Sequence, residues 1–178
     1  MVARIAWGER RFDFTFPVDF FPELIERLRG TPARVAARLP SVPADLVRRR
    51  VNGQWSMQEH AGHLGDLDTG LFLPRLDDYE AGARMLRPAD MENAATERAN
   101  HNARSLAEVL EHVRSARAVV VDRLERYDAA FFNRTAEHPR LGTTMRVVDM
   151  LYFQAEHDDY HLARITELIR ATAPTAGG

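Results

Sequence analysis

Apolar residues along most of this chain recur every three or four positions, which is the spacing of one helix face. The first such segment spans residues 21–39. A Gly-Thr-Pro step at residues 30–32 divides it into two short helices or one kinked helix, because proline is tolerated at the first position of a helix. After a loop over residues 40–43, a further short helix is predicted over residues 44–50. Helices are therefore expected from residue 21 onward.

Two capping boxes mark long helices further along the chain. In each, a serine side chain and a glutamate three residues later satisfy each other's free backbone N–H groups. The motifs are Ser56 with Glu59, and Ser105 with Glu108. The first predicts a helix over residues 56–81, followed by a polar connection over residues 82–96. The second lies at the start, or in the first turns, of a helix whose apolar stripe continues to Tyr127.

The last helix is predicted to be capped by Thr143 or Thr144 and to run to about residue 171. A loop over residues 128–142, which contains His138, precedes it. Evidence for strands is nearly absent from the whole sequence. Four main amphipathic segments with long connections predict an all-α fold, a four-helix bundle with one extra short helix.

The two ends of the chain differ from this helical pattern. Phe12, Phe14 and Phe16 alternate with polar residues until Pro17, so residues 1–16 are expected to form an extended arm that packs on the body or on a partner. Residues 172–178 are expected to be a frayed tail. The length of 178 residues fits one domain over residues 1–178.

Composition excludes several classes of function. The net charge of −2 argues against a nucleic-acid partner, which normally leaves a basic footprint. No apolar run is long enough for a membrane helix or a signal peptide, so a cytoplasmic protein without membrane contact is expected. The chain contains no cysteine, which excludes thiolate nucleophiles and Cys-ligated zinc. It also contains no lysine, because all 24 basic residues are arginine, and Schiff-base chemistry is therefore excluded.

Three histidines are the candidates for chemistry. His157 and His161 are four residues apart, which places both imidazoles on one helix face, and they fall in the middle of the apolar stripe. His63 occupies a similar position on the predicted helix over residues 56–81. Three imidazoles from two helices could hold a divalent metal ion with one position left open for water or substrate. The residues alone leave a second interpretation open, in which each histidine has a separate core or surface role.

The remaining histidines and nearby acids give weaker signals. His60 is expected to be exposed at the flank of its helix, and His138 to have a structural role in its loop. His101 and His112 have no evident partner. Four acids lie near the candidate histidines in sequence: Glu59, Asp66, Glu156 and Asp158. One could orient an imidazole through its second nitrogen, and most are expected to face solvent.

At these residues the chain resembles the DinB/YfiT-like superfamily. The matching segments are Trp55-Ser-Met-Gln-Glu-His-Ala-Gly-His63-Leu, His138-Pro-Arg-Leu-Gly142 and Glu156-His157-Asp-Asp-Tyr-His161-Leu-Ala-Arg-Ile165. The resemblance extends over nearly the whole length. It implies a four-helix bundle with up-down-down-up connectivity, a divalent ion such as zinc or nickel on His63, His157 and His161, and a homodimer.

The resemblance also implies possible reactions on a small-molecule substrate. Members of the superfamily include transferases that use the thiol bacillithiol, a mycothiol-dependent isomerase, and proteins classed as hydrolases. We therefore expect a metal-dependent enzyme that activates a low-molecular-weight thiol, such as bacillithiol, for transfer of its sulfur to a small electrophile. The alternatives are a hydrolase that uses metal-bound water, a non-catalytic metal-binding module of the stress response, and a helical dimerisation domain.

Overall fold

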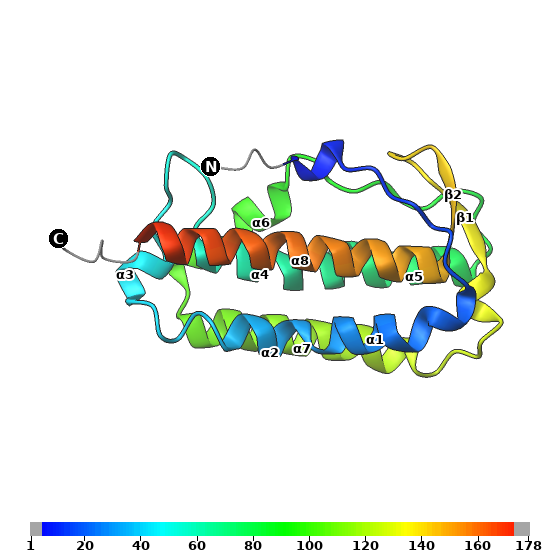
Figure 1. The fold of residues 1–178 in the computed structure, drawn as a ribbon, viewed down its shortest axis with the longest axis horizontal. Coiled ribbons are helices and arrows are strands. Elements are labelled where there is room, and N and C mark those ends of the chain that lie inside the picture. Colours follow the sequence, from blue (N-terminus) through cyan, green and yellow to red (C-terminus); the bar gives the residue numbers. More distant parts are fainter. Residues whose placement is uncertain (1–4, 173–178) are drawn as a thin grey trace.

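Four long helical segments lie side by side and form the body of the protein (Figure 1). The computed structural model describes residues 5–172. Along the long axis of Figure 1, α1 and α2 run in one direction, α4–α5 and α7 run in the opposite direction, and α8 returns in the first. This up-down-down-up connectivity confirms the predicted bundle. The helices are α1 Phe21–Arg29, α2 Thr31–Ala36, α3 Ala44–Val47, α4 Met57–Leu67, α5 Leu73–Glu80, α6 Ala94–Ala99, α7 Leu106–Leu124 and α8 Val147–Thr172.

Local sequence signals set most of the helix boundaries. Both predicted capping boxes are formed, at Ser56 before α4 and at Ser105 before α7. A single π-helical turn, Asp68–Phe72, joins α4 to α5, so the predicted helix over residues 56–81 is continuous but locally underwound. The first segment is divided at Gly30, as its Gly-Thr-Pro step predicts. Among the described residues, no helix is apolar over a stretch long enough to cross a bilayer.

The segment before α8 differs from its prediction. Residues 128–142 are not a simple loop, because β1, Thr135–His138, pairs antiparallel with β2, Thr143–Arg146. The prediction that Thr143 or Thr144 caps the last helix is therefore wrong, since both lie in β2. The Asp149 carboxylate in the first turn of α8 instead accepts the backbone N–H of Arg146 at 2.8 Å. Strands of four residues are too short to show a clear alternating pattern.

Two other predicted segments also need correction. The polar connection over residues 82–96 runs into the short helix α6, which begins at Ala94. The described part of the arm contains a 3₁₀ turn at Trp7–Glu9 and pairs with no strand among the described residues. Its rings pack on the body of the protein, as predicted, with the ring centroids of Phe12 and of Phe153 in α8 4.9 Å apart. Thr172 belongs to α8, and the rest of the predicted frayed tail lies outside the described residues.

A buried ionic cluster connects the four main helical segments inside the apolar core. Arg117 of α7 donates to Asp68 at 2.8 and 3.0 Å and to Asp158 of α8 at 2.5 and 3.1 Å. Its guanidinium also donates to the Leu28 carbonyl of α1 at 2.9 Å, and Thr31 donates to Asp158 at 2.7 Å. Because all these groups are buried, the pairing satisfies charges that would otherwise be unpaired in a low-dielectric interior.

Candidate metal centre

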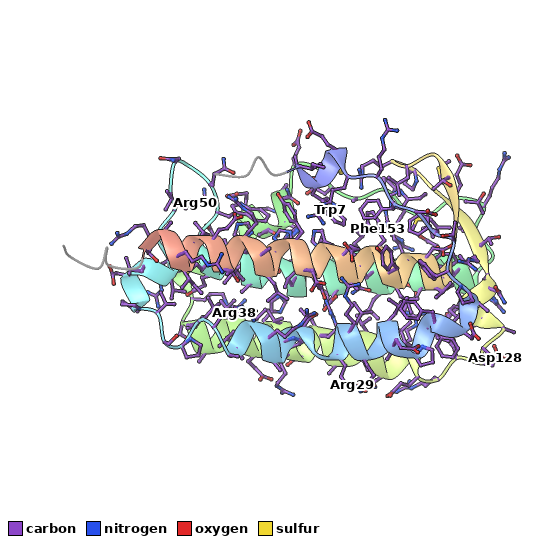
Figure 2. The ribbon with its side chains drawn as sticks, viewed as in Figure 1. Trp7, Arg29, Arg38, Arg50, Asp128 and Phe153 are labelled. Carbon is purple, nitrogen blue, oxygen red and sulfur yellow. The ribbon has the colours of Figure 1, made fainter. Side chains whose placement is uncertain are left out.

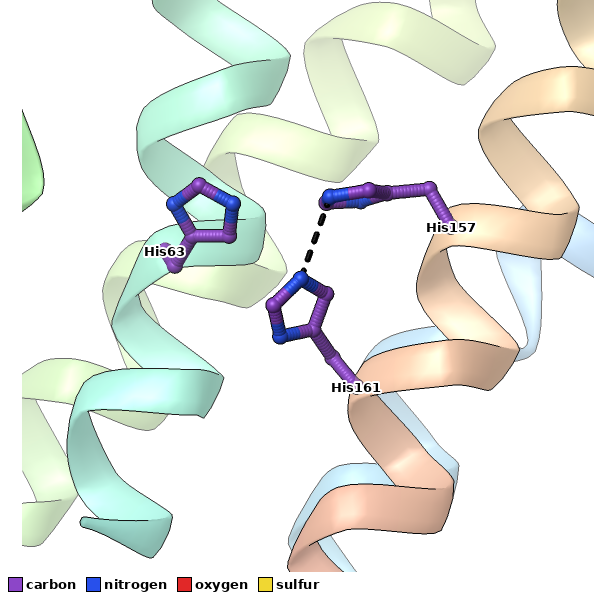
Figure 3. Close-up of side chains that lie close together, drawn as sticks. All are labelled: His63, His157 and His161. Carbon is purple, nitrogen blue, oxygen red and sulfur yellow. Dashed lines mark hydrogen bonds between the residues drawn. The ribbon is translucent and has the colours of Figure 1, made fainter. Parts of the chain in front are cut away.

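The three histidines singled out by sequence meet inside the bundle. His63 projects from α4 toward His157 and His161 on α8, and all three are buried (Figure 3). Each offers one ring nitrogen, and these atoms all lie within 4.8 Å of one another. The Nε2 atoms of His157 and His161 are 3.1 Å apart. The structure therefore brings the whole predicted set together, from segments almost 100 residues apart in sequence.

The donor set suits a divalent ion. Imidazole nitrogens are common ligands of zinc and nickel, and three of them leave a coordination position for a substrate. His157 Nδ1 is buried without a hydrogen-bond partner within the described structure, so this ring is incompletely satisfied there. Three clustered imidazoles in an apolar interior would each lose hydration, whereas coordination uses their lone pairs.

Burial keeps these rings neutral. Desolvation, with the neighbouring His157 and His101 as smaller causes, lowers the pKa of His63 to about 3. Desolvation likewise lowers the pKa of His157 to about 3 and that of His161 well below its usual value. Their lone pairs are therefore available to a metal at neutral pH, since protons do not compete for them.

The same pKa shifts predict how the metal-free protein responds to acid. An unfolded histidine has a pKa near 6.5, so below that pH the unfolded chain binds protons that the folded chain does not bind. The free energy of unfolding should therefore fall between about pH 6.5 and pH 3, by about 1.4 kcal/mol per pH unit for each histidine that stays neutral. Urea unfolding of metal-free protein at pH 7.5, 6.5 and 5.5 measures this, and a flat profile would contradict it.

His60 supports the centre from the same helix as His63. It was expected to be exposed, yet it is buried, and its Nδ1 lies 2.8 Å from His161 Nδ1. If His161 presents Nε2 to an ion, its Nδ1–H donates to His60, whose own hydrogen is then on Nε2. His60 Nε2 is buried without a partner and the ring lines the cavity described below. The exposure prediction failed because the bundle closes over this flank of α4.

Asp66 supports His63 through an intervening hydroxyl. His63 Nδ1 lies 2.9 Å from Thr96 Oγ1, and that hydroxyl donates to an Asp66 oxygen at 2.9 Å. Thr96 must then accept from His63 Nδ1–H, which leaves the His63 Nε2 lone pair free for an ion. His101 Nε2 and His112 Nε2 bond to Asp66 at 2.8 and 3.0 Å. These two histidines, expected to have no partner, thus meet on one carboxylate and help hold its pKa well below the usual range.

Two glycines of α4 make this arrangement possible. A Cβ added at Gly62 would lie 2.4 Å from the His101 ring, and one added at Gly65 would lie 2.7 Å from the His112 ring. Carbon atoms cannot approach so closely, so any side chain at these positions would displace the rings from Asp66. Two glycines flanking the site on α4 were the available sequence signal, but they do not identify which distant residues approach.

The hydroxyl of Thr96 should affect metal affinity. Changing Thr96→Val removes the group that orients His63, and losses of a supporting hydrogen bond of this kind lower affinity by about 10–100-fold. The Thr96→Ser variant keeps the hydroxyl and should retain most of the affinity. Competition against a chromophoric chelator measures both variants. Equal affinities for the valine variant and the unmodified protein would show that this hydrogen bond has no role in coordination.

The acids near the histidines have other partners. Glu59 and Asp158 were expected to face solvent, but both are buried, Glu59 bonding to Arg50 and Asp158 to Arg117. Glu156 is half-buried and paired with Arg27. None of these three bonds to His63, His157 or His161 among the described residues, so Asp66 alone of the four is linked to the centre by hydrogen bonds, through Thr96.

A cavity of about 630 Å³ opens next to the three histidines. The arm, α4, α5, α8, the loop before α6 and the hairpin all contribute to its walls. Its aromatic wall includes Trp7, which lies 5.0 Å from the His157 ring, and Trp55, which lies 4.8 Å from the His63 ring. A volume of this size fits a small molecule. Further lining residues include Leu67, Leu71, Phe72, Arg75, His138, Arg140, Phe153 and Arg164.

The sequence of this chain matches a known protein family, and its fold is similar to those of solved structures. A model of the DinB superfamily matches residues 25–165. The fold is similar to that of YfiT from Bacillus subtilis, described as a probable metal-dependent hydrolase with an unusual four-helix bundle topology. That match has a TM-score of 0.78 at 18% identity and covers 93% of this chain and 95% of YfiT.

A second solved structure also shares the fold. It is the mycothiol-dependent maleylpyruvate isomerase, with a TM-score of 0.61 at 14% identity. The match covers 84% of this chain and 61% of the isomerase. No curated protein matches the sequence at a significant level.

Proposed function

The chain belongs to the DinB superfamily, and from this premise we propose that it is a metal-dependent enzyme that transfers the sulfur of a low-molecular-weight thiol to a small electrophile. The observation that carries the proposal is the convergence of three buried imidazoles at the wall of a cavity of about 630 Å³. The proposed ligands are His63, His157 and His161. The thiol comes from a cosubstrate such as bacillithiol, because the chain has no cysteine.

A divalent ion on these ligands would supply Lewis acidity, which lowers the pKa of a thiol at the open position. The chain's own residues orient and enclose the reactants. His60 and Thr96 fix which nitrogen of His161 and His63 faces the site. Trp7, Trp55 and Phe153 line the cavity with aromatic rings, which would limit water around bound reactants and so strengthen electrostatic interactions there. In the reaction a carbon–sulfur bond forms, the leaving group departs with its electron pair, and the thiol proton passes to solvent.

A hydrolase is the second candidate, supported by the shared fold with YfiT, a probable metal-dependent hydrolase. It would use the same three ligands, with water taking the place of the thiol. The two functions differ in their requirement for a thiol and in the product.

Turnover of 1-chloro-2,4-dinitrobenzene with bacillithiol tests the proposal. The zinc- or nickel-loaded protein should release chloride faster than the spontaneous reaction with the thiol, and removing the ion with a chelator should abolish this added rate. Restoring the ion should restore the rate. Turnover that survives complete removal of the metal would overturn the proposal, and hydrolysis of ester substrates without any thiol would favour the second candidate.

A further inference from the structure

We propose that the cavity contains a binding site for an oxyanion, formed by Arg75, Arg140 and His138, about one helical turn from His157. The site would hold a carboxylate or phosphate group of the substrate while its reacting atom reaches the histidine centre. The use of the site in catalysis rests on the proposed function. The site itself is defined by residues that do not touch the three histidines among the described contacts.

Arg75 is a buried cation with no counter-ion among residues 5–172. Its side chain, from α5, is almost wholly buried, and its Nε and Nη2 both donate to the Arg87 carbonyl at 3.1 Å. Among the described residues it forms no ion pair with a carboxylate. Desolvation lowers its pKa to about 10. Arg117, which is buried to the same degree, pairs with two carboxylates, whereas Arg75 pairs with none in the described part of the chain.

Arg140 adds a second guanidinium that has no counter-ion in the part of the chain that the structure describes. It follows β1 in the hairpin connection, and its Nη1 donates to the Gly8 carbonyl of the arm at 2.9 Å. Its Nη2 is buried and has no hydrogen-bond partner among the described residues. Burial lowers the pKa of Arg140, and its charge is one of those that lower the pKa of Arg75. Two guanidiniums that repel each other and line one cavity favour an anion between them.

His138 provides an independent argument for a missing acceptor. The Leu141 backbone N–H points at its Nδ1 at 3.2 Å, and Arg75 Nη1 lies 3.2 Å from its Nε2. Burial and the neighbouring arginines lower the pKa of His138 to about 4, so the ring is neutral and has only one lone pair. One of the two donors therefore lacks an acceptor. If Nδ1 accepts from Leu141, then His138 Nε2–H and Arg75 both donate toward the same point, where an oxyanion oxygen would accept both.

The acids that line the cavity do not neutralise these arginines. Glu97 is bonded to Arg50 and to Trp55 Nε1. Asp90 accepts the backbone N–H groups of Glu92 and Ala94 in its own loop. The unpaired positive charge of the cavity is thus available to a ligand.

Phe153 sets the distance between the two parts of the cavity. It precedes His157 by four residues on α8, a separation of about 6 Å. Its ring centroid is 5.2 Å from that of His138 and 5.7 Å from the Arg140 guanidinium carbon. Trp7 lies 5.0 Å from both Phe153 and His157, and Figure 2 shows Trp7 on the arm and Phe153 on α8 on the same side of the bundle. A substrate with a short apolar spacer between its anionic and reacting groups would fit this arrangement.

Anion titrations of the full-length, metal-free protein test the site without the metal. Succinate and inorganic phosphate are added while the fluorescence of Trp7 and Trp55 or the heat of binding is recorded, with neutral succinamide as the comparison. One anion per chain should bind saturably, and succinamide should not. Arg140→Gln should weaken binding by about tenfold or more, the effect of losing one charged hydrogen bond. The Arg164→Gln substitution, at the other end of the cavity, should change anion binding little.

The proposed oxyanion site would be wrong if neither anion binds saturably, or if the Arg140→Gln variant binds the anions as tightly as the unmodified protein. Because these titrations contain no metal and no thiol, their result is separate from that of the turnover assay. In active holoenzyme, the same variant identifies the source of the anion. A raised KM for bacillithiol alone places the oxyanion on the thiol, whereas a raised KM for a carboxylate-bearing electrophile, but not for its amide, places it on the electrophile.

Discussion

Replacing Arg117 with leucine should lower the free energy of unfolding by about 3–5 kcal/mol, because it leaves Asp68 and Asp158 buried without their shared cation. A domain of ordinary stability has about 5–15 kcal/mol in total, so the variant would be close to unfolding at room temperature. Urea denaturation followed by circular dichroism measures the change. The slope of the transition should stay the same if the variant still unfolds in one step.

Arg114→Leu on the same helix is the matched control. Arg114 is exposed and paired with Glu111, and exposed ion pairs contribute little, so stability should not change measurably. Adding Asp158→Asn to the Arg117→Leu variant should restore part of the loss, since it removes one of the stranded charges. Equal stability of the two single arginine variants would show that the buried cluster does not stabilise the bundle.

Replacing His161 with alanine should lower metal affinity by more than about 100-fold, which exceeds the usual effect of losing a group that only supports a ligand. His161 shares the centre with His63 and His157, and its removal leaves two nitrogens, too few to retain a divalent ion tightly. Affinity is measured by competition with a chromophoric chelator, using zinc and nickel separately. Thiol-dependent turnover should disappear with the metal.

His138→Gln is the matched control for this loss. His138 is a buried histidine in the same cavity, but its described contacts are to Leu141, Arg75 and Phe153 and not to the three proposed ligands. The metal affinity of the His138→Gln variant should remain that of the unmodified protein. If His138→Gln and His161→Ala lose affinity equally, binding would depend on histidine content in general and the assignment of ligands would be wrong.

Local signals were sufficient for most of the fold. Capping boxes at Ser56 and Ser105 placed the starts of α4 and α7 because a cap depends on residues three apart in sequence. The hairpin before α8 was missed because β1 and β2 are stabilised by pairing with each other, not by their own pattern. Likewise, the π-helical turn at Asp68–Phe72 lies where Asp68 bonds to Arg117 and Gln154, and these long-range contacts leave no periodic trace.

The candidate centre was predictable only in part. The i, i+4 spacing of His157 and His161 on an apolar stripe indicated a shared face, and His63 occupied a similar position on its own helix. The resemblance to the DinB/YfiT-like superfamily then implied that all three are metal ligands. The supporting groups were not predictable, because the contacts of Asp66 with Thr96, His101 and His112 join residues 30 or more positions apart. His60 was misassigned for the same reason, since its burial depends on α8, about 100 residues away.

The most direct test of the metal centre is X-ray absorption spectroscopy of purified protein loaded with one equivalent of zinc. Coordination by His63, His157 and His161 predicts three imidazole nitrogens at about 2.0–2.1 Å, with a further position filled by water or added thiol. It also predicts that this spectrum is lost in the His161→Ala variant. A bound ion surrounded by carboxylate oxygens, or no stoichiometric zinc at all, would contradict the assignment of these three residues as the metal ligands.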